Sequence, residues 1–358
     1  MQTTQGSRAF ARRVADIEPF RVVEVLTRAR ELEASGREIL HLAAGEPDFT
    51  TAAPIVEAGR RALAEGHTGY SAAAGIPPLR EALSGWYRDR YGLDVTPERI
   101  MVTSGASGAL LLIAALIVDP GSGILMTDPG YPFNRHFLRL VEGEVQLVPV
   151  DASSRCQQSA ELVDRHWRPN TRGVLAASPA NPTGATLSLP DLRSIADVCR
   201  RRGGCLVVDE IYHGLGYDVD TPSVLQADPD AFVINSFSKY FGMTGWRLGW
   251  VVAPAAAISE MEKLAQNLFI SLSTMAQYAA LAGFSPATLD ILEQRRDVFR
   301  QRRDFLWPAV EELGFEVPCR PEGAFYIYAD AGRFTDDSQR FCMELLEAHG
   351  VALTPGID

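Results

Sequence analysis

Lysine is rare in this chain, and its rarity singles out Lys239 as a candidate for chemistry. The sequence contains 34 lysine and arginine residues, yet only Lys239 and Lys263 are lysine. Arginine stays protonated and forms no Schiff base, whereas a partly desolvated lysine can lose its proton and become a nucleophile. Lys263 follows Glu260 at helical spacing, as in an ordinary surface ion pair. Lys239 is therefore the candidate nucleophile, with a solvated loop lysine as the alternative.

Two polar residues lie near Lys239 in the sequence. Ser236 precedes it by three residues and Arg247 follows it by eight. A hydroxyl and a guanidinium suit a phosphate dianion, because both donate hydrogen bonds and the guanidinium is cationic. A cofactor that carries an aldehyde and a phosphate would use all three groups. Pyridoxal phosphate fits that description.

The segment from Ser236 to Trp250 reads SxxKxxxxxxxRxGW. It resembles the cofactor-lysine signature of the class I and II aminotransferases, the fold-type I pyridoxal-phosphate enzymes, and the resemblance runs from about Leu42 to the end of the chain. It implies that Lys239 holds the cofactor as an internal aldimine and then moves the substrate's α-proton as general acid and base. A free amine in a dry, cationic site has a lowered pKa that suits this proton transfer.

Further motifs match the family in the same order along the chain. TSGASGAL is a glycine-rich turn whose free N–H groups could bind phosphate at a helix start, through Gly105, Ala106 and Ser107. The resemblance places Tyr131 on the face of the cofactor's pyridine ring. It places Asn181 on the ring hydroxyl oxygen and in contact with the substrate.

An apolar run ends at Asp209, and Tyr212 follows three residues later. A carboxylate there can keep the pyridine nitrogen protonated, which lets the ring withdraw electrons from the substrate's α-carbon. Tyr212 would hydrogen-bond the ring oxygen, and Gly45 matches the family's substrate-contacting glycine. Tyr70 matches a tyrosine that reaches the cofactor phosphate of the neighbouring subunit, so the resemblance implies a homodimer. Singly, each motif could equally be a turn, a helix start or a packing residue.

Short apolar runs separated by helices or loops begin at Arg99. The predicted strands are residues 100–103, 124–127, 145–150, 174–177, 206–208, 232–234 and 248–253. Runs of this kind, mostly without polar alternation, predict an α/β fold with a largely parallel sheet covered on both faces. Ligands of such sheets gather beyond the carboxyl ends of the strands, where the candidate residues fall.

We predict a large cofactor-binding domain at residues 46–286 and a smaller α+β domain built from residues 1–45 and 287–358. Helices are expected over 14–35, 55–65, between 254 and 284, from Ser285 onward and over 338–349. Pro308 should bend or restart the fourth of these. Strands are expected over 38–42, over 351–354 and, with alternating polarity, from Arg320 onward.

Composition narrows the class of protein. The net charge of −11 disfavours nonspecific binding of nucleic acid or anionic membrane. The longest apolar run, Ala109–Val118, is shorter than the ~20 residues that a membrane helix needs, and the first residues lack the apolar core of a signal peptide. The five cysteines are odd in number without a CxxC pair, which indicates a reduced compartment. We expect a cytoplasmic protein that binds no metal, nucleic acid or membrane.

The sequence predicts an aminotransferase that acts on an amino acid and a 2-oxo acid, and three alternatives stay open. A C–S β-lyase of the same cofactor class would share every residue named. The S-x-x-K of penicillin-recognising hydrolases is present, but its partner strings SDN and KTG are not. An aminotransferase-like regulator domain would need a DNA-binding module that the ~40 preceding residues are too short to supply. No arginine lies in 266–273 to anchor a side-chain carboxylate, which favours neutral amino acids.

The sequence departs from the family at its end. After a turn like Thr354-Pro355-Gly356, the family continues with a loop, a closing strand and a helix, and the strand carries the arginine that clamps the substrate α-carboxylate. The sequence stops at Asp358. We therefore expect a truncated form that binds the cofactor but turns over slowly, unless another cation holds the carboxylate.

Overall fold

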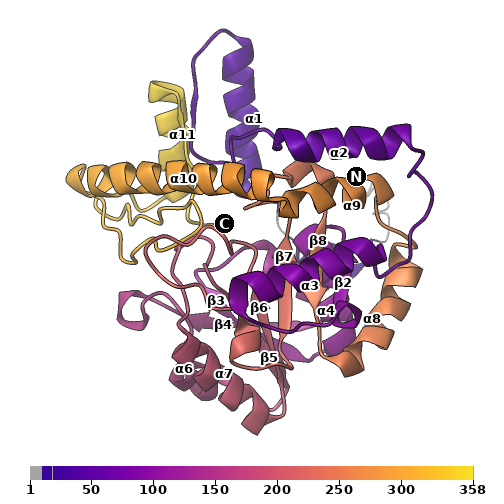
Figure 1. Ribbon diagram of the computed structural model, residues 1–358. Helices are drawn as coiled ribbons and strands as arrows, with labels where there is room; N and C mark the ends of the chain where they lie inside the picture. The colour runs from indigo at the N-terminus through magenta and orange to yellow at the C-terminus, as the bar shows by residue number, and fades with distance from the viewer. Residues whose placement is uncertain (1–9, 18, 358) are drawn as a thin grey trace, which may run out of the picture.

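The computed structural model describes residues 10–17 and 19–357, and a seven-stranded sheet lies at its centre (Figure 1). In spatial order the strands are β2 (Ile100–Thr103), β8 (Gly249–Val252), β7 (Phe232–Ser236), β6 (Cys205–Asp209), β5 (Thr171–Ala177), β3 (Gly123–Asp128) and β4 (Glu144–Pro149). β8 runs antiparallel to both of its neighbours, and the other pairs are parallel. The predicted α/β fold with a largely parallel sheet is confirmed, and all seven predicted strands are present.

Helices cover both faces of this sheet. They are α2 (Ala53–Ala64), α3 (Pro77–Tyr91), α4 (Gly105–Ile117), α5 (Phe133–Leu140), α6 (Ala160–His166), α7 (Leu189–Arg202), α8 (Ala255–Leu268) and α9 (Thr274–Leu281). On β6, Val208 packs in a hydrophobic cluster with α3, α7 and α9, whereas Val207 packs in a second cluster with α4 and α8. Because both faces are buried, the strands have few polar residues.

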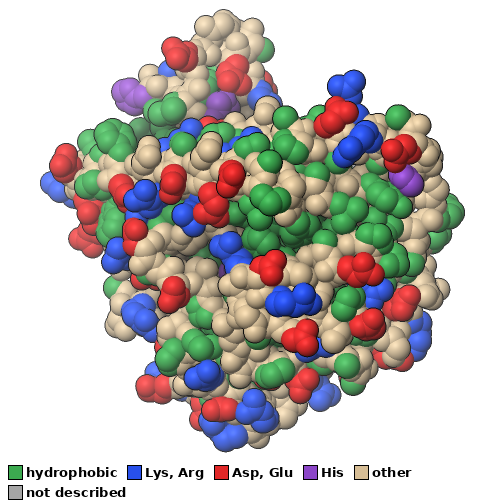
Figure 2. Space-filling model, viewed as in Figure 1, with side chains coloured by type: hydrophobic (Ala, Val, Ile, Leu, Met, Phe, Trp, Pro, Cys, Tyr) green, Lys and Arg blue, Asp and Glu red, His purple; other side chains and the backbone are tan. Residues whose placement is uncertain are grey.

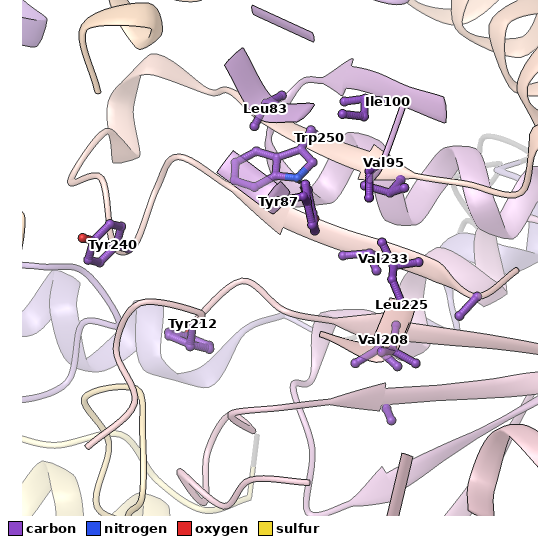
Figure 3. Close-up of a cluster of buried hydrophobic side chains, with 14 of the residues drawn as sticks. Leu83, Tyr87, Val95, Ile100, Val208, Tyr212, Leu225, Val233, Tyr240 and Trp250 are labelled. Atoms are coloured by element: carbon purple, nitrogen blue, oxygen red, sulfur yellow. Dashed lines mark hydrogen bonds between the residues drawn. The ribbon is translucent and has the colours of Figure 1, made fainter. Parts of the chain in front are cut away.

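Trp250 anchors α3 to the sheet. Its side chain on β8 is fully buried, and its Nε1 donates a hydrogen bond to Tyr87 Oη on α3 at 3.1 Å. Figure 3 shows the two rings together, with Leu83 and Ile100 close by. Truncating a buried aromatic of this size costs about 3–5 kcal/mol. The contact therefore fixes β8 and, with it, the position of Arg247, which lies just before the strand.

A second, smaller group of elements comes from the two ends of the chain. It contains α1 (Arg21–Ala34), α10 (Pro286–Glu312), α11 (Ser338–His349) and a parallel pair of short strands, β1 (Leu40–His41) and β9 (Val351–Ala352). Val25 of α1 and Leu346 of α11 are buried in a cluster of their own. Figure 1 shows α1 and α11 beside each other, with α10 crossing below them. The domain boundaries after residues 45 and 286 remain predictions.

Three predicted elements differ in the structure. The first helix begins at Arg21 instead of residue 14, with a short 3-10 turn at Arg12–Val14 before it. Pro19 lies between them, and its missing N–H would cost a continuous helix one hydrogen bond. Pro308 lies inside α10 without restarting it. The region between 254 and 284 forms two helices, α8 and α9, where one continuous stretch was predicted.

The alternating strand predicted from Arg320 is wrong. Residues 324 and 325 form a turn, and Ala324 adopts a φ of 61°. The backbone bonds of this segment go to a loop, because Ala324 N–H donates to Leu215 O at 2.9 Å and Tyr217 N–H donates to Glu322 O at 2.8 Å. Isolated bridges at Gly323 and Asp330 take the place of a ladder.

Two of the five cysteines are paired in the structure, which the prediction of a reduced compartment did not include. Cys156 and Cys319 form a disulfide with their Cα atoms 6.0 Å apart, and both residues are buried. Their 163-residue separation hid the pair in the sequence. Cys199, Cys205 and Cys342 are free thiols.

The surface carries acidic and basic side chains side by side on the face seen in Figure 2. Across the described part of the chain, no helix is long and apolar enough to cross a membrane. Residues 10–17 and 19–357 contain no group of three or more His, Cys, Asp or Glu residues placed to hold a metal ion.

Candidate active site

The candidate residues meet at one edge of the sheet because of the strand register. Gly249, the first residue of β8, pairs with Ser236 at the end of β7 and with Thr103 at the end of β2. The glycine-rich turn after β2, the loop after β7 and Arg247 just before β8 therefore surround one point. Parallel strands and an antiparallel neighbour bring these three sequence-distant segments together.

Gly105 and Arg247 form a candidate anion site at this point. Gly105 begins α4 with a φ of 66°, and a Cβ atom placed on it would lie 2.8 Å from Arg247 Nη2. The first turn of α4, which includes Ala106 and Ser107, receives no side-chain hydrogen bond from its N-cap residue, Ser104. Backbone N–H groups at a helix start beside a guanidinium favour a phosphate.

Ser236 is engaged inside its own loop. Its buried hydroxyl donates to Leu248 O at 3.1 Å and accepts from Ser238 N–H at 3.0 Å. Its hydroxyl also lies 3.0 Å from the hydroxyl of Ser238. The side chain therefore holds the turn that carries Lys239, and its contact with a phosphate remains a prediction.

The amine of Lys239 is enclosed and bonded to the loop after β1. Its Nζ donates to Gly45 O at 2.6 Å and lies 5.9 Å from the ring centroid of Tyr212 and 5.7 Å from that of Phe325. Burial lowers the pKa of this amine to about 8. The Lys239 amine is therefore neutral in a larger fraction of protein molecules near pH 7 than an exposed lysine would be.

Charged groups adjust that pKa in both directions. The carboxylates of Glu46 and Asp209 raise the pKa of Lys239, and the guanidinium of Arg247 lowers it. Glu46 is itself held by a hydrogen bond from Thr244 Oγ1. Neither Glu46 nor Thr244 was predicted from the sequence as part of the site.

Asp209 is a buried carboxylate at the end of β6. Burial raises its pKa to about 7, while the backbone N–H of Ile211, 3.0 Å from Oδ1, and the Lys239 amine lower it. A buried acid with this pKa lacks a strong cationic partner, so a ring N–H⁺ placed against it would favour the carboxylate. Asp209 fits the predicted role beside a pyridinium nitrogen.

Tyr326 is a site residue that the sequence analysis missed. Its hydroxyl lies 2.6 Å from the hydroxyl of Tyr212, and a Cβ atom on Gly45 would lie 2.5 Å from it. Burial raises the pKa of Tyr131, and the nearby Tyr326 and Asp209 side chains raise it further. Tyr131 therefore lies close to these two residues. Tyr326 was missed because its segment was predicted to be an alternating strand. The adjacent aromatic residues Phe325 and Tyr326 were the sequence feature that could have indicated it.

Two predicted site residues stand apart from these contacts. Asn181 follows β5 at the same edge of the sheet, before a cis peptide bond to Pro182. Tyr70 lies in the loop between α2 and α3, and its side chain is 87% exposed. One chain therefore does not enclose Tyr70 in the site.

A half-buried lysine, a buried carboxylate and a candidate anion site lie at one edge of a mostly parallel sheet, an arrangement typical of α/β enzymes. Residues 37–357 match the model of the family "Aminotransferase class I and II". The chain belongs to this family and is an aminotransferase. The family prediction and the predicted activity are both confirmed.

Known proteins resemble the chain over nearly its whole length. A valine–pyruvate aminotransferase of Mycobacterium tuberculosis is 37% identical, covering 96% of this chain and 89% of that protein. An aspartate/prephenate aminotransferase of Thermus thermophilus is 37% identical, with 98% and 91% covered. The crystal structure of an aminotransferase from Mycobacterium tuberculosis has a TM-score of 0.94 at 36% identity, covering 97% of this chain and 89% of that one.

Proposed function

We propose that this aminotransferase uses pyridoxal phosphate and moves an amino group between a neutral L-amino acid and a 2-oxo acid. The observation that carries the proposal is Lys239, a rare lysine whose enclosed amine has a pKa of about 8. An amine with that pKa can act as a nucleophile and then as a general base near neutral pH.

The residues present fit the cofactor group by group. Lys239 would hold its aldehyde carbon, and Asp209, buried without a strong cationic partner, would hold its pyridine nitrogen. The cradle that a Cβ on Gly105 would fill suits its phosphate. The other proposed contacts are Ala106, Ser107, Ser236 and Arg247 for the phosphate, Tyr131 for the ring face, and Asn181 and Tyr212 for the ring oxygen. When bound, the cofactor supplies an electron sink for the substrate's α-carbon.

The protein's own residues then have separate tasks. Lys239 accepts a proton at Nζ, and its enclosed position keeps water from competing for that proton. Asp209 would keep the pyridine nitrogen of the cofactor protonated. Gly45 offers a backbone carbonyl beside the reacting amine, and its lack of a side chain leaves room for Tyr326 and for substrate. We assign the substrate contacts to Gly45 and Asn181.

The substrate class rests on two observations. Residues 266–273 contain no arginine to pair with a side-chain carboxylate. The Mycobacterium tuberculosis relative is named for valine and pyruvate, while the Thermus thermophilus relative is named for aspartate and prephenate. The absence of an arginine in 266–273 favours the neutral class for this chain.

We also propose a cytoplasmic homodimer in which Tyr70 completes the neighbour's site. Ser71 N–H donates to Ser271 Oγ at 2.8 Å, which joins the loop that carries Tyr70 to the loop that carries Ile270. Tyr70 is 87% exposed and Ile270 is 60% exposed. Two large exposed side chains of this kind suit a covered interface.

A donor panel tests the reaction. Valine, alanine, aspartate and phenylalanine would each be offered with pyruvate or 2-oxoglutarate, and the new amino acid would be quantified. Neutral donors should exceed aspartate by at least tenfold in kcat/KM, whereas preference for aspartate would contradict the substrate class. Pyruvate and ammonia released from cysteine conjugates without an acceptor would instead support a C–S β-lyase.

A complementation experiment tests the shared site. Lys239→Ala and Tyr70→Ala variants would be inactive or weak alone. In a mixed dimer one site would keep both native residues, so mixing after mild dissociation should restore up to a quarter of the wild-type activity. No recovery in a mixture proven by mass to contain mixed dimers would contradict the role of Tyr70.

A further inference from the structure

Tyr326 reaches the site from a different part of the chain than every residue assigned above. It lies 114 residues after Tyr212, in the segment that follows α10, yet the two hydroxyl oxygens are 2.6 Å apart. The rings meet edge to face, with centroids 5.6 Å apart. Tyr212 is buried and Tyr326 is half-buried.

The position of Tyr326 is fixed from two sides. Gly45 lacks a Cβ at the place where one would collide with the Tyr326 hydroxyl. The turn before Tyr326 is tied to the large sheet's loops, because Ala324 N–H donates to Leu215 O and Tyr217 Oη donates to Ala324 O at 2.5 Å. The hydroxyl is therefore held at Tyr212 by backbone contacts as well as by its own bond.

The number of protons on the two hydroxyls decides which tyrosine donates the hydrogen bond. Each phenol has one proton to donate and two lone pairs that accept. If Tyr212 donates its proton to the cofactor's ring oxygen, it can only accept from Tyr326. A donor that also accepts a hydrogen bond becomes a stronger donor, since linked hydrogen bonds polarise one another.

We propose that Tyr326 is a positioning residue that donates to Tyr212 and holds the Tyr212 hydroxyl aimed at the cofactor's ring oxygen. This inference rests on the proposed function, because it requires that cofactor and the ring-oxygen contact of Tyr212. It adds a residue from the C-terminal part of the chain to the control of the cofactor's charge.

Other charged or titratable groups face the pair. They are Asp209 at the end of β6, Tyr131 after β3 and Lys239 after β7. A Tyr326→Phe substitution leaves all three in place and keeps the aromatic ring. A change in the cofactor's titration would therefore report the lost hydroxyl.

The test is a spectroscopic titration of the cofactor-loaded protein between pH 5 and 10, without substrate. A hydrogen bond to the ring oxygen stabilises its negative charge, which is most concentrated when the Lys239 nitrogen bonded to the cofactor is unprotonated. Losing the donor should raise the pKa seen in the visible spectrum. Tyr212→Phe should raise it by about one unit, and Tyr326→Phe by roughly half a unit.

The double substitution distinguishes positioning from independent effects. Because Tyr326 acts through Tyr212, the double variant should titrate like Tyr212→Phe alone. Tyr240→Phe is the matched control, since it removes a tyrosine hydroxyl that donates to Glu293 and takes no part in the contacts that hold Tyr326 or Tyr212. It should leave the cofactor's pKa unchanged.

The outcomes separate this inference from the proposed function. A shift for Tyr212→Phe with none for Tyr326→Phe would overturn the positioning role alone. Additive shifts in the double variant, or an equal shift in Tyr240→Phe, would overturn it too. A wild-type protein without a visible cofactor band would refute the proposed cofactor, and with it the inference.

Discussion

The amine of Lys239 donates a 2.6 Å hydrogen bond to the carbonyl oxygen of Gly45, a residue 194 positions earlier in the chain. This bond joins the loop after β7 to the loop after β1, so the reactive nitrogen lies between the large sheet and the N-terminal segment. A carbonyl cannot neutralise a charge. The amine is therefore held in place while burial lowers its pKa to about 8.

Replacing Asp209 with alanine should leave the cofactor bound but slow the chemistry. An unprotonated pyridine is a poorer electron sink, so we expect a loss of several kcal/mol in transition-state stabilisation, or at least ~100-fold in rate. Single-turnover kinetics with a neutral amino acid measure this directly. Asp230→Ala, at an exposed position near β7, serves as the control. Near-normal turnover in Asp209→Ala would mean that another group protonates the ring.

Asp209 should also make the stability of the cofactor-free protein depend on pH. Its pKa is about 7 in the folded protein against an ordinary 3.8, so the folded state holds the proton more tightly. The contribution of Asp209 to the unfolding free energy is fully present below pH 3.8 and is lost as the pH rises towards 7. The difference is ~4 kcal/mol.

Chemical denaturation of wild type and Asp209→Asn at pH 5 and pH 7.5 isolates this contribution. The wild type should lose more unfolding free energy over that interval than the variant. Glu210, whose pKa burial raises to about 8, acts in the same direction in both proteins and cancels in the comparison. Equal losses would contradict the assigned pKa of Asp209.

A methyl group on Gly105 should damage cofactor binding. Gly105→Ala puts a Cβ atom 2.8 Å from Arg247 Nη2 at a residue whose φ is 66°. Displacing the guanidinium should raise the Kd for the cofactor at least ~10-fold, about 1.4 kcal/mol. Gly121→Ala is matched for backbone strain, with a φ of 80° and no atom within 4 Å of the added Cβ. If both variants bound the cofactor equally well, the proposed cradle would be wrong.

The disulfide between Cys156 and Cys319 should contribute to stability. It closes a loop of 163 residues, and removal of a native disulfide costs about 2–5 kcal/mol. Cys319→Ser should lower the unfolding free energy by that amount, and dithiothreitol should have no further effect on the variant. Cys342→Ser is the control at a buried free thiol. A wild type insensitive to reductant, with both thiols free by alkylation, would contradict the bond.

The sheet and its ligand-bearing edge were predictable because they follow from local patterns. Strands buried on both faces have continuous apolar runs, and residues such as Asp209 and Ser236 end those runs. Once the strands are parallel, their ends must lie at one edge. The spacing from Ser236 through Lys239 to Arg247 then predicted the loop that crosses that edge.

Features that depend on long-range packing were not predictable in this way. Tyr326 lies in an alternating stretch typical of a strand, and its place beside Tyr212 follows from hydrogen bonds to Leu215 and Tyr217 far away in sequence. The pairing of Cys156 with Cys319 likewise needs the fold first. The start of the first helix was misplaced because periodicity outweighed the signal of Pro19.

The covalent attachment of the cofactor to Lys239 tests the central claim most directly. Purified protein loaded with pyridoxal phosphate would be reduced with borohydride, digested, and mapped by mass spectrometry, alongside Lys239→Ala and the surface control Lys263→Ala. We predict a single stable adduct on the peptide containing Lys239, retained in Lys263→Ala and absent from Lys239→Ala together with transamination. A full adduct at another site, or undiminished transamination in Lys239→Ala, would contradict the account.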